Sequence, residues 1–553
     1  MDRRKLFSML TSTTEEEPMR PTTALPVNGG LTPYQGSWNY ATAAHLLRRA
    51  MFGPTHEQIK GAVSDGLQKT LDKLATDQAL PSPPVLYTDQ IADPEIPKGQ
   101  TWVTGKLNPQ VQGLVQIKES SLYSWLMQLM FNEGVSLTEK MTLFWHNHFV
   151  VSEIFDPRYN YDYITTLRSN CMGNFKSLTE KITIDKAMLV YLNGNQNTNL
   201  APNENFAREV MELFTLGKGA LAGPGDYTTY TETDVKELAR ALSGWIDVRN
   251  ATAIIKTEFR VGRHDVRPKT LSHRFNNEVI NNAGADEYKN VVDIIFKKPE
   301  VAIFMATKLY RWFVKSWIEE DIKKNVIIPL ADIIRSNNYE IGPAVKALIS
   351  SQHFYDECVI GAIIKNPVDF IINPNNQMQV ALPTTDALKV TVFQGINRGF
   401  ATPMEMAIFD APSVAGWPQY YQEPGFSRLW LNASSLPTRK RYSDAIASVG
   451  ISYQQGSYRF QIDILKTVNQ FIKPDDVDHV LAELSLILLV KPLAANQLTL
   501  LKGILNTGNT GDWTKAYTTY KSNPSNQTNL TIINTRLRNL VVYMMRMPEY
   551  HLS

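Results

Sequence analysis

The sequence predicts a mainly α-helical protein, a large multi-helix array with long loops and at most a small β-ribbon. Three observations predict this class. Helix-starting capping patterns recur along the chain, apolar residues between them repeat at helical spacing, and runs that alternate apolar and polar residues are rare. Hydrophobic residues make up 43% of the chain and charged residues 20%, which indicates a globular protein with enough apolar surface for a core.

Composition and hydrophobic periodicity divide the 553 residues into three predicted regions. Residues 1–36 are rich in Pro, Thr and Gly and predict a flexible N-terminal arm. Residues 37–440 form the predicted main helical body with the candidate site. Residues 441–553 form a predicted C-terminal helical region packed on that body.

The first predicted helices are marked by caps and breakers. Thr42 is expected to cap a helix that ends before Gly53. Thr55 and Gln58 form a capping box that opens a second helix. Gly66 is expected to separate this helix from a third, and the proline-rich stretch 80–110 predicts an irregular excursion.

Two further helices carry most of the candidate chemistry. Ser136 and Glu139 fit a capping box, and the helix after it runs toward His146. Asn203, beside a proline, is expected to cap another helix that stops near Gly217.

The remainder of the chain continues in the same helical pattern with one exception. Alternating residues within 250–285 predict the chain's small β-ribbon. Further helices are predicted from Thr231, at 287–296, at 301–317, twice within 328–352, from 365 and through 440–550, with a loop-rich stretch at 380–430.

Charge and cysteine content limit the possible functions. The formal net charge of +2 disfavours a nucleic-acid binder, and the short basic run at 439–441 is interpreted as a solvated helix end. Cys171 and Cys358 are too few for a disulfide framework; two buried free thiols are favoured, and one bridge remains open.

The sequence also limits export and membrane insertion. The apolar run 486–490 is far shorter than the ~20 residues that a membrane-spanning helix needs, so no span is expected. Arg3 and Arg4 are typical of a twin-arginine export signal, but the segment after them is polar and lacks the apolar stretch. A cytoplasmic chain is therefore favoured, with export as the alternative.

Several motifs in fixed order resemble one bacterial family. The chain contains NENFARE and AGWP blocks, and the matching segments are residues 45–55, 139–141 with 144–149, 201–217, 230–245, 264–265 with 269–270, 412–418 and 547–550. In these blocks the chain resembles the domain-of-unknown-function 1800 family over nearly everything after residue 36.

The resemblance implies a helical protein whose activity is unassigned. Many members carry export signals, and their genes often neighbour a family similar to alkaline phosphatases and sulfatases, which implies a possible phosphatase/sulfatase-like partner. The chain departs from the family in its poor N-terminal signal and in Ser272, where members often have glycine.

The helix after Asn203 carries the sharpest candidate site. Asn205, Glu209 and Glu212 share one helix face, and Glu204 lies in the first turn, where the helix dipole favours an anion. Neighbouring carboxylates are able to act as acid and base when their environments differ. The structural alternative is that Glu204 closes a cap and Glu212 pairs with Arg208.

Histidines from distant segments are the other candidate catalytic residues. His146 and His148 point about 200° apart on a helix and share a face only if the chain is extended, where they are able to chelate a metal. His264 with Asp265 is a third candidate, with Asp265 expected to bind backbone. For each histidine, the alternative is a buried hydrogen bond.

Aromatic and polar residues near these positions are candidates for ligand binding. Loop 412–430 contains aromatics that suit sugar stacking, or plain packing of a long loop. The candidate ligand-binding residues are Asn203, Asn205, Lys269, Trp417 and Trp430.

These patterns support three hypotheses. The first is a cofactor-independent hydrolase that cleaves a glycan-like substrate by glutamate acid/base chemistry. No cofactor is predicted, because phosphate-binding, dinucleotide-binding and nucleophile-elbow motifs are absent from the sequence. The second is a non-catalytic partner or scaffold for a phosphatase/sulfatase-like protein, and the third is a metal site built from His146, His148 and a glutamate.

Overall fold

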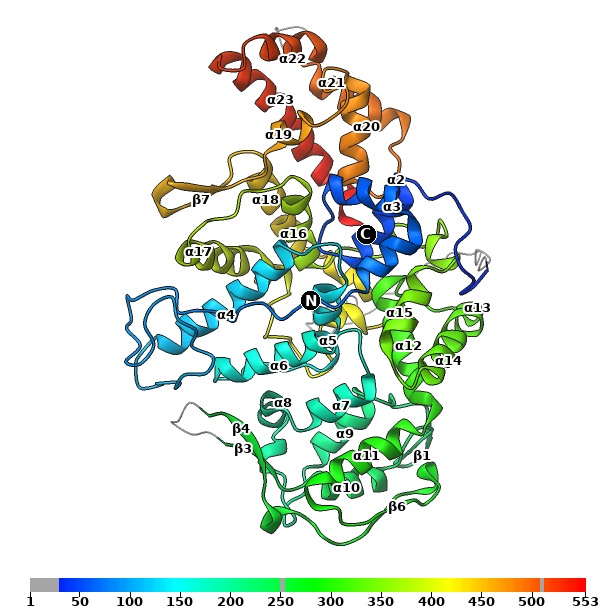
Figure 1. The fold of residues 1–553 in the computed structure, drawn as a ribbon. Coiled ribbons are helices and arrows are strands. Elements are labelled where there is room, and N and C mark those ends of the chain that lie inside the picture. Colours follow the sequence, from blue (N-terminus) through cyan, green and yellow to red (C-terminus); the bar gives the residue numbers. More distant parts are fainter. Residues whose placement is uncertain (1–28, 249–253, 508–511) are drawn as a thin grey trace, which may run out of the picture.

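The computed structural model describes residues 29–248, 254–507 and 512–553 and confirms the mainly α-helical class (Figure 1). Helices of the first third are α2 (Tyr40–Ala50), α3 (His56–Leu74), α4 (Leu114–Phe131), α5 (Thr138–His148), α6 (Pro157–Ser169), α7 (Phe175–Thr183) and α8 (Lys186–Tyr191). The Thr55 capping box is confirmed. Gly66 (φ 79°, ψ 165°) is non-helical and separates α3 into two helical segments, as expected. The N-cap of α2 is Asn39, and Thr42 completes its capping box from the third helical position.

The predicted capping box at Ser136 is wrong. α5 begins after Leu137, which makes no side-chain cap bond. The Ser136 hydroxyl instead bonds Thr138, and Glu139 is drawn into a buried ion pair with Arg168 (2.7 Å). Glu139 therefore forms an ion pair with a residue distant in sequence and not the capping contact that the local pattern predicts.

The middle of the chain contains α9 to α11 and three of the four short two-stranded sheets found in the described residues. These elements are α9 (Glu204–Glu212), β1 (Leu221–Gly223), β2 (Asp226–Tyr227), α10 (Glu232–Ala241), β3 (Trp245–Val248), β4 (Lys256–Phe259), β5 (Lys269–Thr270), β6 (Val279–Ile280) and α11 (Glu287–Phe296). Antiparallel pairs join β1 to β2, β3 to β4 and β5 to β6. The last two pairs overlap the predicted ribbon region.

The remaining elements return to helices. They are α12 (Pro299–Phe313), α13 (Glu320–Ile322), α14 (Ile328–Ser336), α15 (Ile341–Ile349), α16 (Pro367–Gln377), α17 (Asp386–Ile396), α18 (Ser435–Ala447), β7 (Ile451–Tyr453), β8 (Tyr458–Phe460), α19 (Ile464–Val468), α20 (Val477–Leu488), α21 (Ala495–Leu505), α22 (Trp513–Ser522) and α23 (Gln527–Arg546). None of the described helices is long and apolar enough to cross a membrane.

The helices form one continuous array in which neighbours in sequence are often neighbours in space (Figure 1). α7 to α11 and the strands β1 to β6 gather at one end, and α19 to α23 gather at the other. Between them, α4 packs on α17 and α12 on α14, while α18 contacts α23. The predicted division at 440/441 falls inside α18 and stays a prediction.

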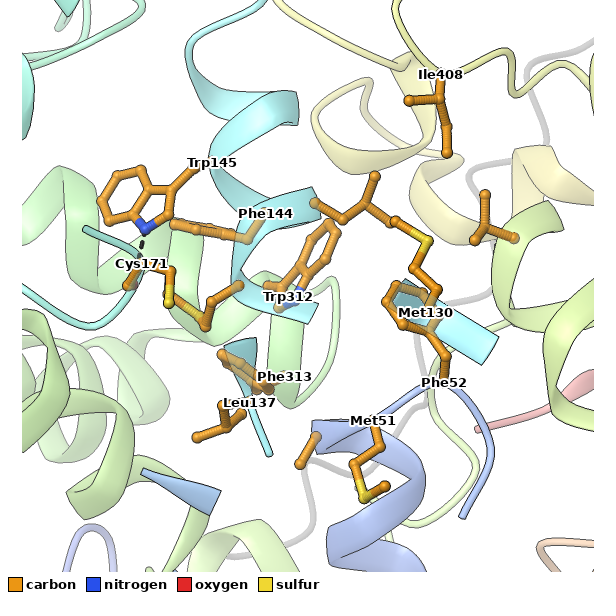
Figure 2. Packing of buried hydrophobic residues seen from close by; sticks show 14 of the residues in the cluster. Met51, Phe52, Met130, Leu137, Phe144, Trp145, Cys171, Trp312, Phe313 and Ile408 are labelled. Carbon is orange, nitrogen blue, oxygen red and sulfur yellow. Dashed lines mark hydrogen bonds between the residues drawn. The ribbon is translucent and has the colours of Figure 1, made fainter. Parts of the chain in front are cut away.

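Aromatic and sulfur-containing side chains fill the centre of the core (Figure 2). The Trp145 indole donates to the Cys171 carbonyl (2.8 Å), and Phe144 meets the edge of Trp312 with ring centroids 5.6 Å apart. Cys171 and Cys358 are both free thiols; Cys171 is buried, as favoured from the sequence, whereas Cys358 is only partly buried.

Two sequence regions behave differently from their expected local character. Residues 29–36 of the predicted arm lie against the body: the Tyr34 N–H donates to the Ser350 carbonyl (2.9 Å), and its ring packs on Tyr355. The twin-arginine-like segment lies outside the described residues. The prediction of a solvated helix end at 439–441 is wrong for Arg439, which is fully buried and donates to the Lys365 carbonyl (2.8 Å).

Candidate functional site

The N-terminus of α9 is held by Asn203. The Asn203 side-chain oxygen accepts the Phe206 N–H (3.1 Å), so the predicted cap is confirmed. Its amide donates to the carbonyls of Leu192 and Asn193, both at 2.9 Å. Both the oxygen and the nitrogen of this side chain therefore help to anchor the helix.

The face of α9 that carries Asn205, Glu209 and Glu212 is only partly covered. Glu212 accepts a hydrogen bond from the Tyr230 hydroxyl (2.6 Å) and lies 3.7 Å from the Lys218 ammonium. In the part of the chain that the structure describes, no hydrogen bond or ion pair engages the half-buried Glu209 carboxylate. Burial and the neighbouring Glu212 charge raise the pKa of Glu209.

The structural alternative expected Arg208 to pair with Glu212, and the structure shows a different partner. Its guanidinium makes a two-pronged pair with Glu232 on α10, at 2.7 and 2.6 Å, and that hydrogen bonding raises the pKa of Arg208. Glu212 is consequently left to Tyr230 and Lys218. Glu204 and Asn205 are exposed in the first turn of α9.

Three consecutive residues end α5, and each binds a different segment. The His146 Nε2 accepts the Phe409 N–H (3.1 Å), and the Asn147 side chain accepts the Trp417 N–H (3.0 Å). The His148 Nε2 donates to the Phe214 carbonyl (3.0 Å) just after α9. Because α5 continues through His148, the extended geometry that metal chelation requires is absent at this pair.

The hydrogen bonds define how the two α5 histidines are protonated. Since His146 Nε2 accepts, its Nδ1 carries the proton and donates a hydrogen bond to the Tyr163 hydroxyl (3.0 Å). That hydroxyl in turn donates a hydrogen bond to the Phe149 carbonyl (2.6 Å). Burial lowers the pKa of His146 to about 3. Burial, aided by the Lys308 charge, holds the pKa of His148 well below its usual range.

His264 lies in a separate buried cluster, defined by His264, Asp265, Lys269 and Glu287 and named here the His264 cluster. His264 Nδ1 faces the Ser243 carbonyl (2.9 Å), and Nε2 faces the Glu287 carboxylate (3.0 Å). The Lys269 ammonium also binds Glu287, and both side chains are fully buried. The imidazole thus reaches a glutamate of α11, not the carboxylates of α9.

Asp265 is fixed by arginines. It accepts from Arg240 (2.9 Å) and from the Arg267 side chain and N–H, the backbone bond being 2.9 Å. Hydrogen bonding to Arg267 and Arg240 depresses the pKa of Asp265 strongly. The charged groups of the His264 cluster all have partners of opposite sign, an arrangement typical of a structural network.

The two loop tryptophans are buried and not displayed for stacking. Trp417 is fully buried and meets the His146 ring edge-on at 5.7 Å. Trp430, 1% exposed, packs edge-on against Tyr420 at 5.9 Å. Of all the residues that the sequence proposes for the site, only Trp430 lines the polar cavity between α2, α5, α12 and α16.

The structure therefore joins some of the predicted residues and separates others. Glu209 and Glu212 share one face of α9, while His264, Asp265 and Lys269 share one buried cluster. Across the described ranges, no hydrogen bond, ion pair or ring contact links the three histidines to Glu204, Glu209 or Glu212. In the same ranges, no three His, Cys, Asp or Glu side chains are grouped to hold a metal ion.

Comparison with known protein families identifies the family to which the chain belongs. A family model described as "Protein of unknown function (DUF1800)" matches residues 45–552, nearly the whole chain. The chain belongs to the DUF1800 family. No curated protein and no solved structure matches this DUF1800 protein.

Sequence reasoning missed the charged residues of the cavity in this DUF1800 protein. Arg49, Lys140 and Arg311 come from three helices, and Asp369 comes from a fourth. The available signal was a charged residue on an otherwise apolar helix: Arg49 follows Leu46 and Leu47, and nearly every residue of α5 around Lys140 is buried. Such residues are rarely buried without a partner, so they mark an interior polar site.

Proposed function

We propose that this DUF1800 protein is a hydrolase that cleaves a glycan-like substrate by glutamate acid/base chemistry. Glu209 is the general acid, and Glu212 is its carboxylate partner. The observation that carries the proposal is the raised pKa of Glu209 beside a glutamate that is held by Tyr230 and Lys218. Carboxyl pairs with unequal environments are the usual machinery of glycosidic cleavage.

The contacts of the two carboxyl groups support different roles. Glu212 receives the contacts of an ionised carboxylate, a phenol donor at 2.6 Å and an ammonium at 3.7 Å. Glu209 has no such contacts among the described residues, so burial favours its protonated form. A protonated acid next to a carboxylate is what proton donation to a leaving group requires.

The exposed first turn of α9 supplies the remaining polar groups of the proposed site. Asn205 lies four residues before Glu209, on the same face, and both it and Glu204 are accessible. The Asn205 amide is suited to binding a sugar hydroxyl. His146, His148 and His264 have no substrate contact in this proposal, because their ring nitrogens face interior groups.

Substitution of Glu209 tests the proposal directly. Glu209→Gln keeps the side-chain shape and removes the transferable proton, so turnover of a hydrolysed member of a glycan panel is expected to fall about 10²–10⁴-fold. The wild-type rate is expected to decline as pH rises through the raised pKa, since a general acid must be protonated. That alkaline limb should vanish in the variant.

The matched control is Glu320→Gln, which changes an exposed glutamate at the start of α13. It should keep wild-type turnover and the wild-type pH profile. Unchanged turnover in Glu209→Gln removes this residue from the mechanism. A panel without any hydrolysed glycan favours the second candidate function.

The second candidate is a non-catalytic partner or scaffold for a phosphatase/sulfatase-like protein. The burial and local pairing of His146, His148 and His264 favour it, because these groups then serve only to hold segments together. A stable stoichiometric complex without turnover by this chain supports this candidate. A purified chain that acts alone on a glycan excludes it.

A further inference from the structure

A polar cavity lies between α2, α5, α12, α16 and the aromatic loop, away from α9, and is named here the α2–α12 cavity. Its open volume is about 30 Å³, room for roughly two water-sized groups. Its lining comes from segments far apart in sequence: Arg49, Lys140, Arg311, Trp312, Ser316, Ile363, Ile364, Asn366, Asp369, Gln419, Tyr420, Ser427, Trp430 and Ser553.

Positive charge exceeds negative charge in the lining. Lys140 and Asp369 form a buried ion pair, and the Asn366 amide also donates to Asp369 (2.8 Å). Arg49 donates only to backbone carbonyls, those of residues 313, 314 and 359, at 2.9 to 3.1 Å. Arg311 has one acidic partner, Glu423, at 3.3 Å.

The balance therefore depends on one exposed carboxylate. The Glu423 side chain is 64% exposed, while Arg311 is 26% exposed and lies over the Phe426 ring at 4.8 Å. Burial lowers the pKa of Arg311, and it lowers the pKa of Arg49 to about 9, which still leaves Arg49 charged near neutral pH. Among the described residues, Arg49 and Arg311 thus form no direct ion pair with a buried carboxylate, and the Asp369 charge acts on Arg49 without a hydrogen bond between them.

Further buried cations stand behind the lining. Arg48 donates to the carbonyls of residues 486 and 487, Lys365 to the Tyr550 carbonyl (2.7 Å), and Arg439 to the Lys365 carbonyl. Carbonyl oxygens satisfy hydrogen bonds without supplying a negative charge. The interior around Asp369 consequently holds more basic than acidic side chains, and burial lowers the pKa of Lys365 to about 7, which removes part of its charge near neutral pH.

Unpartnered donors point to the same place. The Nε atoms of Arg49 and Arg311 and the indole Nε1 of Trp312 are buried and have no hydrogen-bond partner. All three residues line the α2–α12 cavity. The Tyr420 hydroxyl and the Gln419 side-chain oxygen, on two other lining residues, also have no partner among the described residues. Four of these five groups are able to donate and only the Gln419 oxygen and the Tyr420 hydroxyl are able to accept, so unpartnered donors outnumber acceptors and indicate a missing acceptor.

We propose that the α2–α12 cavity binds the oxyanion head group of a small acid, a carboxylate, sulfate or phosphate. Guanidinium groups recognise such oxygens with paired N–H donors, and the Trp312 indole supplies a third. The Trp312 and Tyr420 rings, 4.8 Å apart, provide an apolar contact for the ligand's body. Glu423 is the exchangeable anion that the ligand displaces from Arg311. The site is separate from α9, so it does not depend on the proposed hydrolase.

Titration calorimetry with simple salts tests the site in the full-length chain. Sodium sulfate, sodium phosphate and sodium acetate are titrated at constant ionic strength against chloride, because surface electrostatics respond to ionic strength alone. Saturable binding of at least one anion is expected. The anion that binds most tightly identifies the head group.

Two substitutions at the mouth should change affinity in opposite directions. Arg311→Met removes the guanidinium but keeps an apolar stem over Phe426, so affinity should fall about 10–100-fold, as expected for a charged hydrogen bond. Glu423→Gln removes the competing carboxylate, so affinity should rise about 2–10-fold. Since Glu423 is exposed, this variant keeps the fold even where a core variant does not.

An indole pair provides the matched control. Trp312→Phe removes an unpartnered donor on a residue that lines the cavity, and affinity should fall about 2–10-fold. Trp417→Phe removes another unpartnered indole N–H, on a residue that does not line the cavity, and should bind as the wild type does.

The outcomes separate a built site from a water-filled cavity. Opposite shifts in Arg311→Met and Glu423→Gln, with Trp417→Phe unchanged, support the proposal. Absence of saturable binding, or equal binding by all variants, overturns it. Loss of binding in Glu209→Gln would instead show that the two sites are coupled and overturn their independence.

Discussion

Two groups of buried charges in this molecule differ in how they are compensated. In the His264 cluster, Glu287 binds both Lys269 and His264, and Asp265 is paired with arginines. In the α2–α12 cavity, Arg49 reaches only carbonyls, and donors remain without acceptors. Both groups are buried, so burial alone does not distinguish a charged residue that holds the fold together from one that binds a ligand. We expect that an oppositely charged partner within the chain marks the first kind.

The compensated cluster explains why conspicuous residues of a sequence block need not contact a ligand. Lys269 and Glu287 are fully buried, and their pairing joins strand β5 to helix α11. Unpartnered buried donors lower the free energy of unfolding, and they leave the cavity able to bind an acceptor.

The largest expected effect is at Glu287. Glu287→Gln leaves the buried Lys269 ammonium without a counter-charge, which is expected to lower the free energy of unfolding by about 3–5 kcal/mol. Urea denaturation followed by circular dichroism measures this loss. The neighbouring Asp286→Asn, which alters an exposed carboxylate at the same helix start, should leave the midpoint nearly unchanged. Equal effects of the two variants would contradict a structural role for the cluster.

An intermediate effect is expected from the cations around the cavity. Burial lowers the pKa of Lys365 to about 7 from 10.5. Between these values the unfolded chain holds more protons than the folded chain, so stability rises with pH. Lys365→Met should flatten this rise by up to about 1.4 kcal/mol per pH unit between pH 7.5 and 9. Denaturation curves across that range measure the slope, and an identical slope in the variant would refute the shift.

The smallest effect is expected at Arg311. Without added anion, Arg311→Met should change the free energy of unfolding by less than about 1 kcal/mol, because its acidic partner among the described residues, Glu423, is 64% exposed and screened by solvent. The loss in free energy of unfolding should therefore be much smaller in Arg311→Met than in Glu287→Gln. A loss as large as that at Glu287 would show that Arg311 is a structural cation and that the two regions are alike.

Local chemistry made much of the fold predictable. The caps at Thr55 and Asn203 depend on residues within one turn, and both are confirmed. The helix predicted from Thr231 also begins there, with Thr231 as its N-cap. Ser136 presents the same pattern, but Glu139 leaves it for the distant Arg168. A local rule holds where no tertiary partner competes for its residues.

The candidate site was harder to predict, since its geometry is tertiary. The face shared by Glu209 and Glu212 follows from helical spacing alone, whereas the partners of His146 and His264 lie on other elements. Arg49 and Asp369 approach the same cavity from 320 positions apart, and no spacing rule connects them. Arg439 seemed solvated for the same reason, because nothing nearby in sequence reveals the Lys365 carbonyl.

The end of α5 imposes a constraint on how the chain is able to vary. Its final three residues attach the aromatic loop at Phe409 and Trp417 and the segment after α9 at Phe214. Each residue is turned about 100° from the one before it, so one inserted residue upstream would redirect all three attachments together. The last turn of α5 therefore fixes the rotation of the whole helix, and we expect an insertion or deletion in α5 to disrupt more contacts than a side-chain substitution.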